Sequence, residues 1–382
     1  MARIPFELSD YIIDFLHNDA KALKACALTC QAWVPTARFH LFRTIALKTA
    51  NSTTAFRRLL DKSPSLGLYV RELTAEKLAD TVAIPAAEQP TQEPVQHTLP
   101  LAFAHIPSLQ TLSLSHLDLK CLLDIRGLAH PSVSTLTLSY CQFTELADVV
   151  DLVSSFPRLV SLSMSGLTWK DEERVPAPIA TPTLRSLQLG REMESEKLFE
   201  WLQAASFHES LASLSARCAS EREADLLGAY LKLAGPSLRS FSLDWSVTGD
   251  KNVLTTAAVF TAIILPDNMS LGGCAALEDL TLIFPVHFST SLPWVTSILA
   301  TLDATALRTV SCEIRLLGSI DALDWDGLIA IFSSEAYRSL RTLKFKVNVW
   351  PGVHKDFAEV EAIIRARLGA FDRKGMVHVC KA

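Results

Sequence analysis

The sequence predicts an α/β protein in which an N-terminal three-helix module precedes an irregular right-handed solenoid with a parallel sheet. The main observation is a short apolar strand motif that recurs along most of the chain. A second is the helical spacing of apolar residues ahead of the first copy. A third is composition: 49% of the 382 residues are hydrophobic and 20% are charged, so the bulk of the chain can bury a core.

The first predicted helix follows Ile4 and Pro5. Proline suits the start of a helix, because its missing N–H would have no partner there. Leu8, Ile12 and the pair Phe15 and Leu16 then recur at three- and four-residue intervals. This spacing predicts a helix with one apolar stripe.

Two further helices are predicted before the chain becomes extended. Asp19 is placed to cap the start of a second helix that carries Leu23 and Cys26. A third short helix around Trp33 ends near Arg38, and LFRTIAL continues as an extended segment. Three helices in so few residues form a thin core, so we expect this module to present apolar surface to a partner.

The recurring motif follows the pattern L-x-x-L-x-L. A degenerate copy begins at Val70, and the others are SLQTLSLS (108–115), SVSTLTLS (132–139), RLVSLSMS (158–165), TLRSLQLG (183–190), SLASLSAR (210–217), SLRSFSLD (237–244), ALEDLTLI (276–283), ALRTVSCE (306–313) and SLRTLKFK (339–346). From Leu109 as far as Leu238, successive first anchors lie 24 to 27 residues apart, and they lie 30 to 39 apart afterwards. A period in the twenties with one short strand per unit is typical of leucine-rich repeats.

Within each unit, the L-x-L pair places two apolar side chains on the same face of a strand. The connections between strands are predicted to be partly helical, as in 144–156, where apolar residues fall at helical spacing. Residues 356–369 are predicted to form a final helix and 376–380 a closing strand. Regular leucine-rich repeats place Asn or Cys after the strand, but only Cys141 and Asn348 fit here. We therefore expect an irregular solenoid.

Composition and charge exclude several classes of function. A net charge of −5 argues against a nucleic-acid partner, which normally meets a basic face. The eight cysteines are scattered without a CxxC pair, so neither a disulfide framework nor a metal site is predicted. The most apolar window, 253–265, contains three threonines and is shorter than the ~20 residues that span a bilayer. We expect a soluble cytoplasmic and/or nuclear protein without a membrane partner.

Catalytic motifs are absent from the sequence as well. It contains no G-x-S-x-G, P-loop, G-x-G-x-x-G or H-E-x-x-H pattern. His208, Glu209 and Ser210 have the residue types of a catalytic triad, but adjacent residues cannot adopt triad geometry. We predict no enzymatic activity, no catalytic residues and no cofactor.

The N-terminal module resembles an F-box over roughly its first 45 residues. The resemblance is carried in order by IPFEL (4–8), by Ile12 and Ile13 with Leu16, and by LTCQAW (28–33), where Thr29 replaces the usual valine. The whole chain is similar to the F-box proteins with irregular leucine-rich repeats that are abundant in mushroom-type fungi. The domains would then be an F-box at 1–48, a linking helix at 49–66 and a leucine-rich-repeat solenoid at 67–382, with loop insertions at 84–100 and 171–182.

This resemblance implies the substrate-recognition subunit of an SCF-type cullin–RING ubiquitin ligase. The F-box would dock on a Skp-type adaptor and the repeats would bind a target protein. The implied adaptor-binding residues are Pro5, Leu8, Ile12, Ile13, Leu16, Leu28 and Trp33. The alternative is a non-catalytic leucine-rich-repeat scaffold outside a ubiquitin ligase, whose N-terminal helices only cap the open end of the solenoid.

The target protein is expected on the strand face that the return helices leave free. The residues midway between the two strand leucines form a stripe of small polar side chains that becomes charged near its end. Trp245, just past its strand, is a candidate anchor because aromatic residues dominate interface hot spots. Asp244, Glu313 and Lys344 are candidates for charged contacts. The sequence shows no arginine cluster of the kind that captures phosphate.

Overall fold

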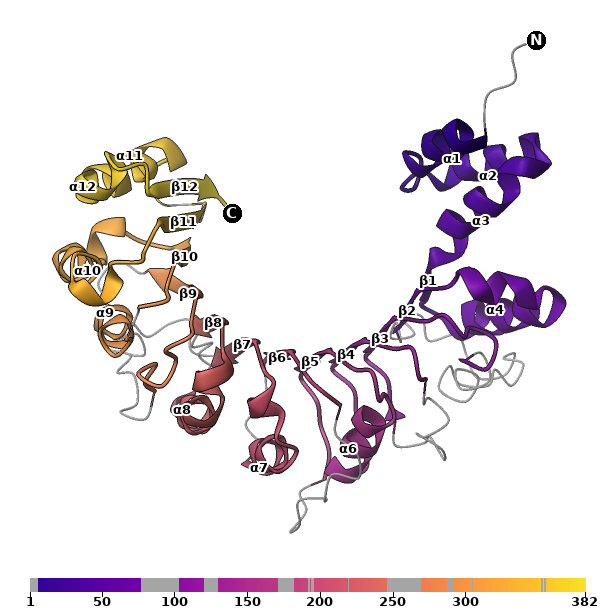
Figure 1. The fold of residues 1–382 in the computed structure, drawn as a ribbon, viewed down its shortest axis with the longest axis horizontal. Helices are drawn as coiled ribbons and strands as arrows, with labels where there is room; N and C mark the ends of the chain where they lie inside the picture. Colours follow the sequence, from indigo (N-terminus) through magenta and orange to yellow (C-terminus); the bar gives the residue numbers. More distant parts are fainter. Residues whose placement is uncertain are drawn as a thin grey trace. The chain divides into compact units, whose positions relative to one another are not determined.

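The computed structural model divides the chain into two compact units, Met1–Thr183 and Leu184–Ala382. Each unit is α/β, with a parallel sheet and helices (Figure 1). The structure describes residues 6–76, 103–119, 130–170, 182–191, 193, 196–218, 220–245, 269–286, 292–303, 305–351, 353 and 355–382. Pro5, the predicted insertion 84–100 and residues 171–181 of the second insertion lie outside the described residues.

The first unit begins with three short helices. These are α1 (Phe6–Asp14), α2 (Ala20–Thr29) and α3 (Val34–Arg43), with a 3-10 turn η1 (Gln31–Trp33) before α3. Asp19 caps α2 as predicted, because its carboxylate accepts hydrogen bonds from the backbone N–H groups of Lys21 and Ala22.

The described residues of the first unit then form five strands: β1 (Thr44–Leu47), β2 (Glu72–Glu76), β3 (Thr111–Ser115), β4 (Thr135–Ser139) and β5 (Ser161–Ser165). They pair in sequence order and in parallel. Helices α4 (Ala50–Lys62) and α6 (Leu146–Ser154) lie on one face of this sheet (Figure 1), and the 3-10 helix η2 (Pro64–Tyr69) leads into β2. The sheet therefore begins within the range predicted for the N-terminal module, since β1 already pairs with β2.

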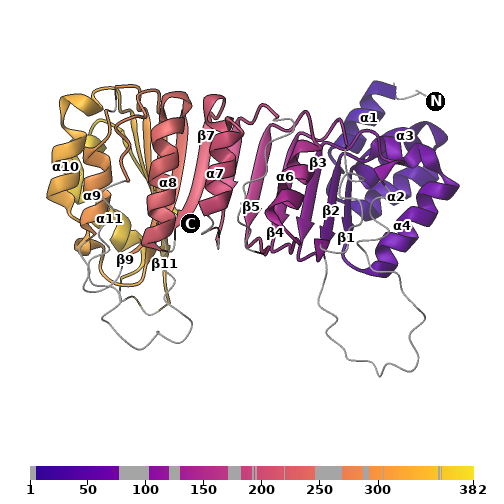
Figure 2. The same cartoon turned by 90° about the horizontal axis from the view of Figure 1, so that it is seen from below.

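The second unit contains β6 (Ser186–Leu189), β7 (Ser213–Cys218), β8 (Ser240–Trp245), β9 (Asp279–Val286), β10 (Thr309–Leu316), β11 (Thr342–Val349) and β12 (Val377–Lys381). These strands also pair in sequence order and in parallel. Its helices are α7 (Glu196–Ala204), α8 (Glu221–Ala234), α9 (Pro293–Ala300), α10 (Trp325–Phe332), α11 (Phe357–Arg367) and α12 (Gly369–Asp372). Figure 2 shows α7, α8, α9 and α10 on one side of the strands. In the described parts of the connections lie the 3-10 turns η5 (Phe207–Glu209), η6 (Gly235–Ser237), η8 (Ile320–Ala322) and η9 (Glu335–Tyr337).

The core of each unit lies between its sheet and its helices. Along the strands, burial alternates residue by residue, as a period of two requires. The predicted core leucines 112, 114, 136, 138, 187 and 189 are all at most 3% exposed. Every predicted repeat motif forms a strand, and the predicted final helix and closing strand correspond to α11 and β12. Within the described residues, no helix is both long and apolar enough to cross a membrane.

The predicted irregularity is visible in the strands. They have four or five residues in the first unit and eight in β9, β10 and β11. Of the two residues that fit the leucine-rich-repeat turn position, Cys141 is buried and its Sγ donates to the carbonyl oxygens of Leu114 and Ser139, at 3.4 and 3.6 Å. Asn348 instead lies within β11, in register with Arg315, and is exposed. Only Cys141 therefore serves the turn.

Candidate functional site

The most unusual surface of the first unit is one face of α1. Leu8, Tyr11, Ile12 and Phe15 are 53%, 61%, 55% and 68% exposed. Their spacing of three and four residues places them on one side of the helix. Phe15 directly follows Asp14, the last residue of α1, and continues this side of the helix. The rings of Tyr11 and Phe15 meet edge to face, with centroids 4.9 Å apart. We call these four residues the α1 apolar face.

The opposite side of α1 is fastened to α3. Ile13 is only 2% exposed and belongs to the small core of the module. Asp10 accepts a hydrogen bond from the Thr36 hydroxyl, and the Asp14 carboxylate lies 2.7 Å from His40 Nε2. These contacts fix the rotation of α1 about its axis. The α1 apolar face is therefore turned to solvent by the packing of the helix, and not by fraying of the chain end.

The residues implied by the F-box resemblance divide by exposure. Leu8, Ile12 and Leu28 are exposed, and Leu28 in the last turn of α2 reaches 89%. Leu16 and Trp33 are half-buried. The prediction that Ile13 contacts a partner is wrong, because α1 directs this side chain into the module core. The sequence interpretation missed Tyr11, although its three-residue step from Leu8 and four-residue step to Phe15 carried the signal.

An exposed apolar face of this kind is typical of interaction sites. Large apolar side chains are normally scattered singly on a protein surface, whereas a contiguous group indicates a protein or membrane contact. Anchors at positions i, i+3, i+4 and i+7 are the pattern by which an amphipathic helix occupies an apolar groove of a partner. The α1 apolar face has these four positions filled by Leu, Tyr, Ile and Phe.

The second predicted interaction surface is the strand face opposite the helices. In the first unit the stripe residues lie in register across neighbouring strands, as Ser113, Thr137 and Ser163. In the second unit the register joins Gln188, Ser215, Ser242, Thr281, Ser311 and Lys344. The predicted stripe is thus confirmed as a continuous row within each unit.

Two of the three charged candidates on this face, Asp244 and Glu313, form ion pairs with residues that were not candidates. Asp244 Oδ2 lies 3.0 Å from Arg315 Nη2 and 3.5 Å from Arg217 Nη1, and its side chain is only 14% exposed. Glu313 pairs with Lys346 at 3.4 Å. Lys344 is exposed. The pairing of Asp244 with Arg315 could not be predicted from the sequence, because the two residues are 71 positions apart and meet only through the strand order.

The expectation that Trp245 is a surface anchor is wrong. Trp245 is 1% exposed and its ring lies beside that of Trp294, with centroids 5.8 Å apart. It is the last residue of β8, at an inward position of the two-residue alternation that also buries Phe241 and Leu243. Counting the alternation one step beyond the leucine motif would have placed it in the core.

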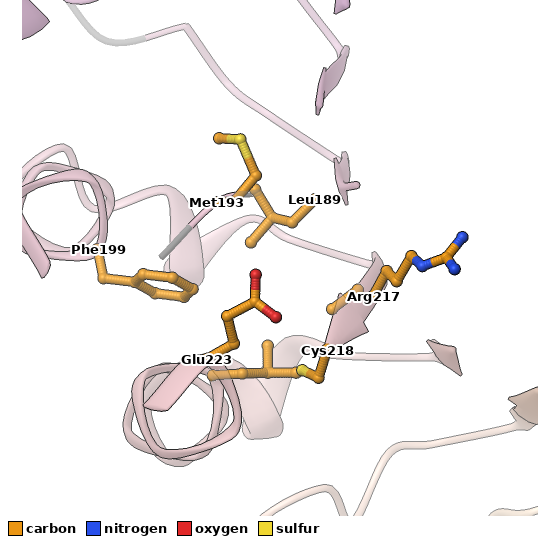
Figure 3. Close-up of a pocket in the computed structure, with 8 residues that line it drawn as sticks. Leu189, Met193, Phe199, Arg217, Cys218 and Glu223 are labelled. Carbon is orange, nitrogen blue, oxygen red and sulfur yellow. The ribbon is translucent and has the colours of Figure 1, made fainter. Parts of the chain in front are cut away.

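A small cavity in the second unit contains a buried carboxylate. Glu223 at the start of α8 is 4% exposed, and Figure 3 shows its carboxylate between Phe199, Met193 and Cys218. Burial raises the pKa of the Cys218 thiol, and the nearby charges of Glu223 and Asp244 add to the effect. The cavity volume is about 10 Å³, which is the space of one water molecule. It offers no room for an organic substrate.

No group of three or more potential metal ligands occurs among the described residues. No protein-family model matches the chain, and neither does any curated protein. Among the described surfaces of the molecule, the α1 apolar face is the most distinctive.

Proposed function

We propose that the chain is an F-box protein with irregular right-handed leucine-rich repeats, and that it acts as the substrate-recognition subunit of an SCF-type cullin–RING ubiquitin ligase. The observation that carries the proposal is the α1 apolar face, which four large apolar side chains form on a helix whose other side is fixed to α3. In this interpretation the face docks on a Skp-type adaptor. Leu28, exposed in the same helical module, adds to the contact.

The repeated strands supply the second half of the proposed function. Each repeat contributes one strand, and the strand residues that face away from the helices remain open to a partner. The target protein would bind the row of small polar residues, with Lys344 as an exposed charge and Asp244 and Glu313 within ion pairs. A flat polar row with paired charges favours hydrogen bonding and shape over long-range attraction.

Co-purification with a Skp-type adaptor tests the docking proposal. Replacing both Leu8 and Ile12 by Asp introduces two charges into the apolar contact, and we expect adaptor binding to fall at least about 100-fold, because each uncompensated charge costs well over 1 kcal/mol. Leu233→Asp is the matched control, since Leu233 is also exposed, at 43%, but lies on α8. Far-ultraviolet circular dichroism verifies that each variant is folded. Full adaptor binding by the folded Leu8→Asp/Ile12→Asp variant would refute the assignment.

The alternative is a leucine-rich-repeat scaffold in which the helical module only caps the sheet. It is favoured by the direct continuation of α3 into β1 and by the contacts of α3 with η2 and β1, through which the module covers the first strand. Capping gives no reason for an exposed apolar face on the outer side of α1. If the full chain binds no Skp-type adaptor while retaining other partners, the scaffold is the better description.

A further inference from the structure

A polar cleft of about 400 Å³ lies in the second unit, at the edge of the sheet where β9, β10 and β11 begin. Three arginines line it, together with one glutamate and the hydroxyls of a serine and a threonine. The residues used below are Glu278, Arg308, Arg338, Ser339 and Arg341. Glu278, Arg308 and the stretch 338–341 come from three successive repeats, which is why the sequence alone showed no cluster of all three arginines.

The repeat itself brings these side chains together. Glu278, Arg308 and Arg341 each immediately precede their strand, in the sequences LEDL, LRTV and LRTL. The backbone N–H of Arg308 donates to the Glu278 carbonyl at 2.8 Å, and that of Arg341 donates to the Arg308 carbonyl at 2.9 Å. Neighbouring parallel strands are roughly 4.8 Å apart. The three side chains therefore project from adjacent positions along one edge.

The counter-charges in the cleft do not balance the arginines. Glu278 is shared between Arg239, at 3.2 Å, and Arg308, at 3.8 Å. Arg338 pairs with Glu335, whose side chain is 85% exposed, so water screens that pair strongly. Arg341 is exposed and forms no ion pair within the described part of the chain. Three arginines thus line the cleft, and Glu278 is the one acidic residue that lines it.

The hydroxyl of Ser339 is also available in the cleft, because it does not make the hydrogen bond that the equivalent serines make in earlier turns. In earlier turns the serine before the first anchor donates to the preceding turn, as Ser210 does to Leu184 O at 2.8 Å and Ser237 to Leu211 O at 2.7 Å. Ser339 occupies the same position, but its hydroxyl has no hydrogen-bond partner within the described residues. In the turn before it, the position is held by Ala306, which also lines the cleft.

We infer that this cleft binds a phosphomonoester. A phosphomonoester carries a charge of about −1.5 to −2 at neutral pH and three acceptor oxygens. Planar guanidinium groups bind such an oxyanion with paired hydrogen bonds, and a monocarboxylate would neutralise only one of them. The volume exceeds that of a phosphate alone, so the group attached to the phosphate also enters the cleft. The phosphate arrives on a peptide side chain or on a small molecule.

Fluorescence anisotropy of the full chain tests the inference. The probe is a labelled glycine–alanine peptide with one central phosphoserine, measured beside its unphosphorylated and glutamate counterparts. We expect only the phosphopeptide to bind, and Arg308→Ala and Arg341→Ala each to weaken it about tenfold, which corresponds to one charge-assisted contact. Arg341→Lys retains the charge without the paired geometry and should give a smaller loss. Arg185→Ala is the matched control, because Arg185 is exposed, precedes β6 in the same way and does not line the cleft.

Each outcome decides the inference. Equal binding of the three peptides, no binding of any phosphate probe, or an equal loss with Arg185→Ala would overturn it, since each result leaves no specific phosphate site. Competition by free phosphoserine and inorganic phosphate distinguishes a phosphorylated peptide from a small phosphorylated molecule as the ligand. Displacement at concentrations near those of the peptide identifies a small phosphorylated molecule, whereas weak displacement identifies a phosphorylated peptide. Arg308 and Arg341 lie outside the helical module, so adaptor binding by these variants tests the proposed function separately.

Discussion

In the first unit, large aliphatic side chains are exposed on helix α1 but buried in the repeated strands. On α1, Leu8 and Ile12 are 53% and 55% exposed, whereas Leu136 and Leu138 of β4 are fully buried. The strand leucines lie between β3 and β5 and beneath helices, so each repeat covers its neighbours. Helix α1 packs mainly on α3 and η1, and Leu8, Tyr11, Ile12 and Phe15 on its outer side are more than half exposed.

This difference in burial indicates that the repeats supply the stability of the fold, whereas α1 keeps apolar surface available for a partner. Apolar area buried within the repeats stabilises the fold at roughly 25 cal/mol per Å². The apolar area of α1 contributes little of this while it faces water, and its burial becomes available when a partner covers it.

The largest expected contrast is in thiol reactivity. Cys30 in the helical module is exposed, whereas Cys312 in β10 is buried, and burial raises the pKa of Cys312 to about 12. The thiolate is the reactive form, so at pH 8 only about one in 10⁴ Cys312 groups would react. We expect iodoacetamide to label Cys30 at least about 1000-fold faster, measured by peptide mass spectrometry. In denaturant the two rates should converge. Comparable rates in the native protein would contradict the burial of Cys312.

The second prediction concerns the core of the repeats. Leu136→Ala should lower the free energy of unfolding by about 2–5 kcal/mol, because it leaves a cavity among side chains that cannot fully collapse into it. Urea denaturation followed by circular dichroism measures the change. A loss below about 0.5 kcal/mol would mean that this strand face does not lie in a packed core.

A third prediction tests the turns that follow the first unit's strands. Gly166 has φ of +60°, and a β-carbon there would collide with the ring of Tyr140, which itself has φ of +53° and stacks on His116 at 5.0 Å. Gly166→Ala should destabilise the protein by about 1–3 kcal/mol. In a Tyr140→Ala background the collision is absent and about 1 kcal/mol should remain, from the left-handed backbone alone. Equal costs in both backgrounds would show that the ring contact does not matter.

The smallest effect is expected on α1. Leu8→Ala and Ile12→Ala should each change the free energy of unfolding by no more than about 0.5 kcal/mol in the isolated chain, because their side chains are already half exposed to water. Thermal and urea unfolding measure this against Ile13→Ala, which should destabilise the module because Ile13 is buried. If Leu8→Ala destabilises as much as Ile13→Ala, the α1 apolar face is part of the core.

The sequence predicted the strands better than the sites. Every repeat motif forms a strand. The two apolar residues of its L-x-L pair set the two-residue period of the strand and the face that is buried, and equivalent pairs lie in register on neighbouring strands. The same alternation, counted one residue further, would have placed Trp245 in the core. On α1 the stripe of Leu8, Ile12 and Phe15 was visible, but spacing alone does not tell a stripe that packs inward from one that faces a partner. Ile13, adjacent to that stripe, is the residue that packs inward.

By itself, the sequence determined the repeat: local leucine spacing and strand periodicity act over a few residues and need no knowledge of the rest of the fold. Only the tertiary structure decided which side of α1 faces solvent, because that depends on the contacts of Asp10 and Asp14 with α3. It likewise decided that Arg308 and Arg341, which belong to different repeats, share one cleft. Parallel stacking places equivalent positions of successive repeats side by side, so residues some 30 positions apart become neighbours only when the sheet has formed.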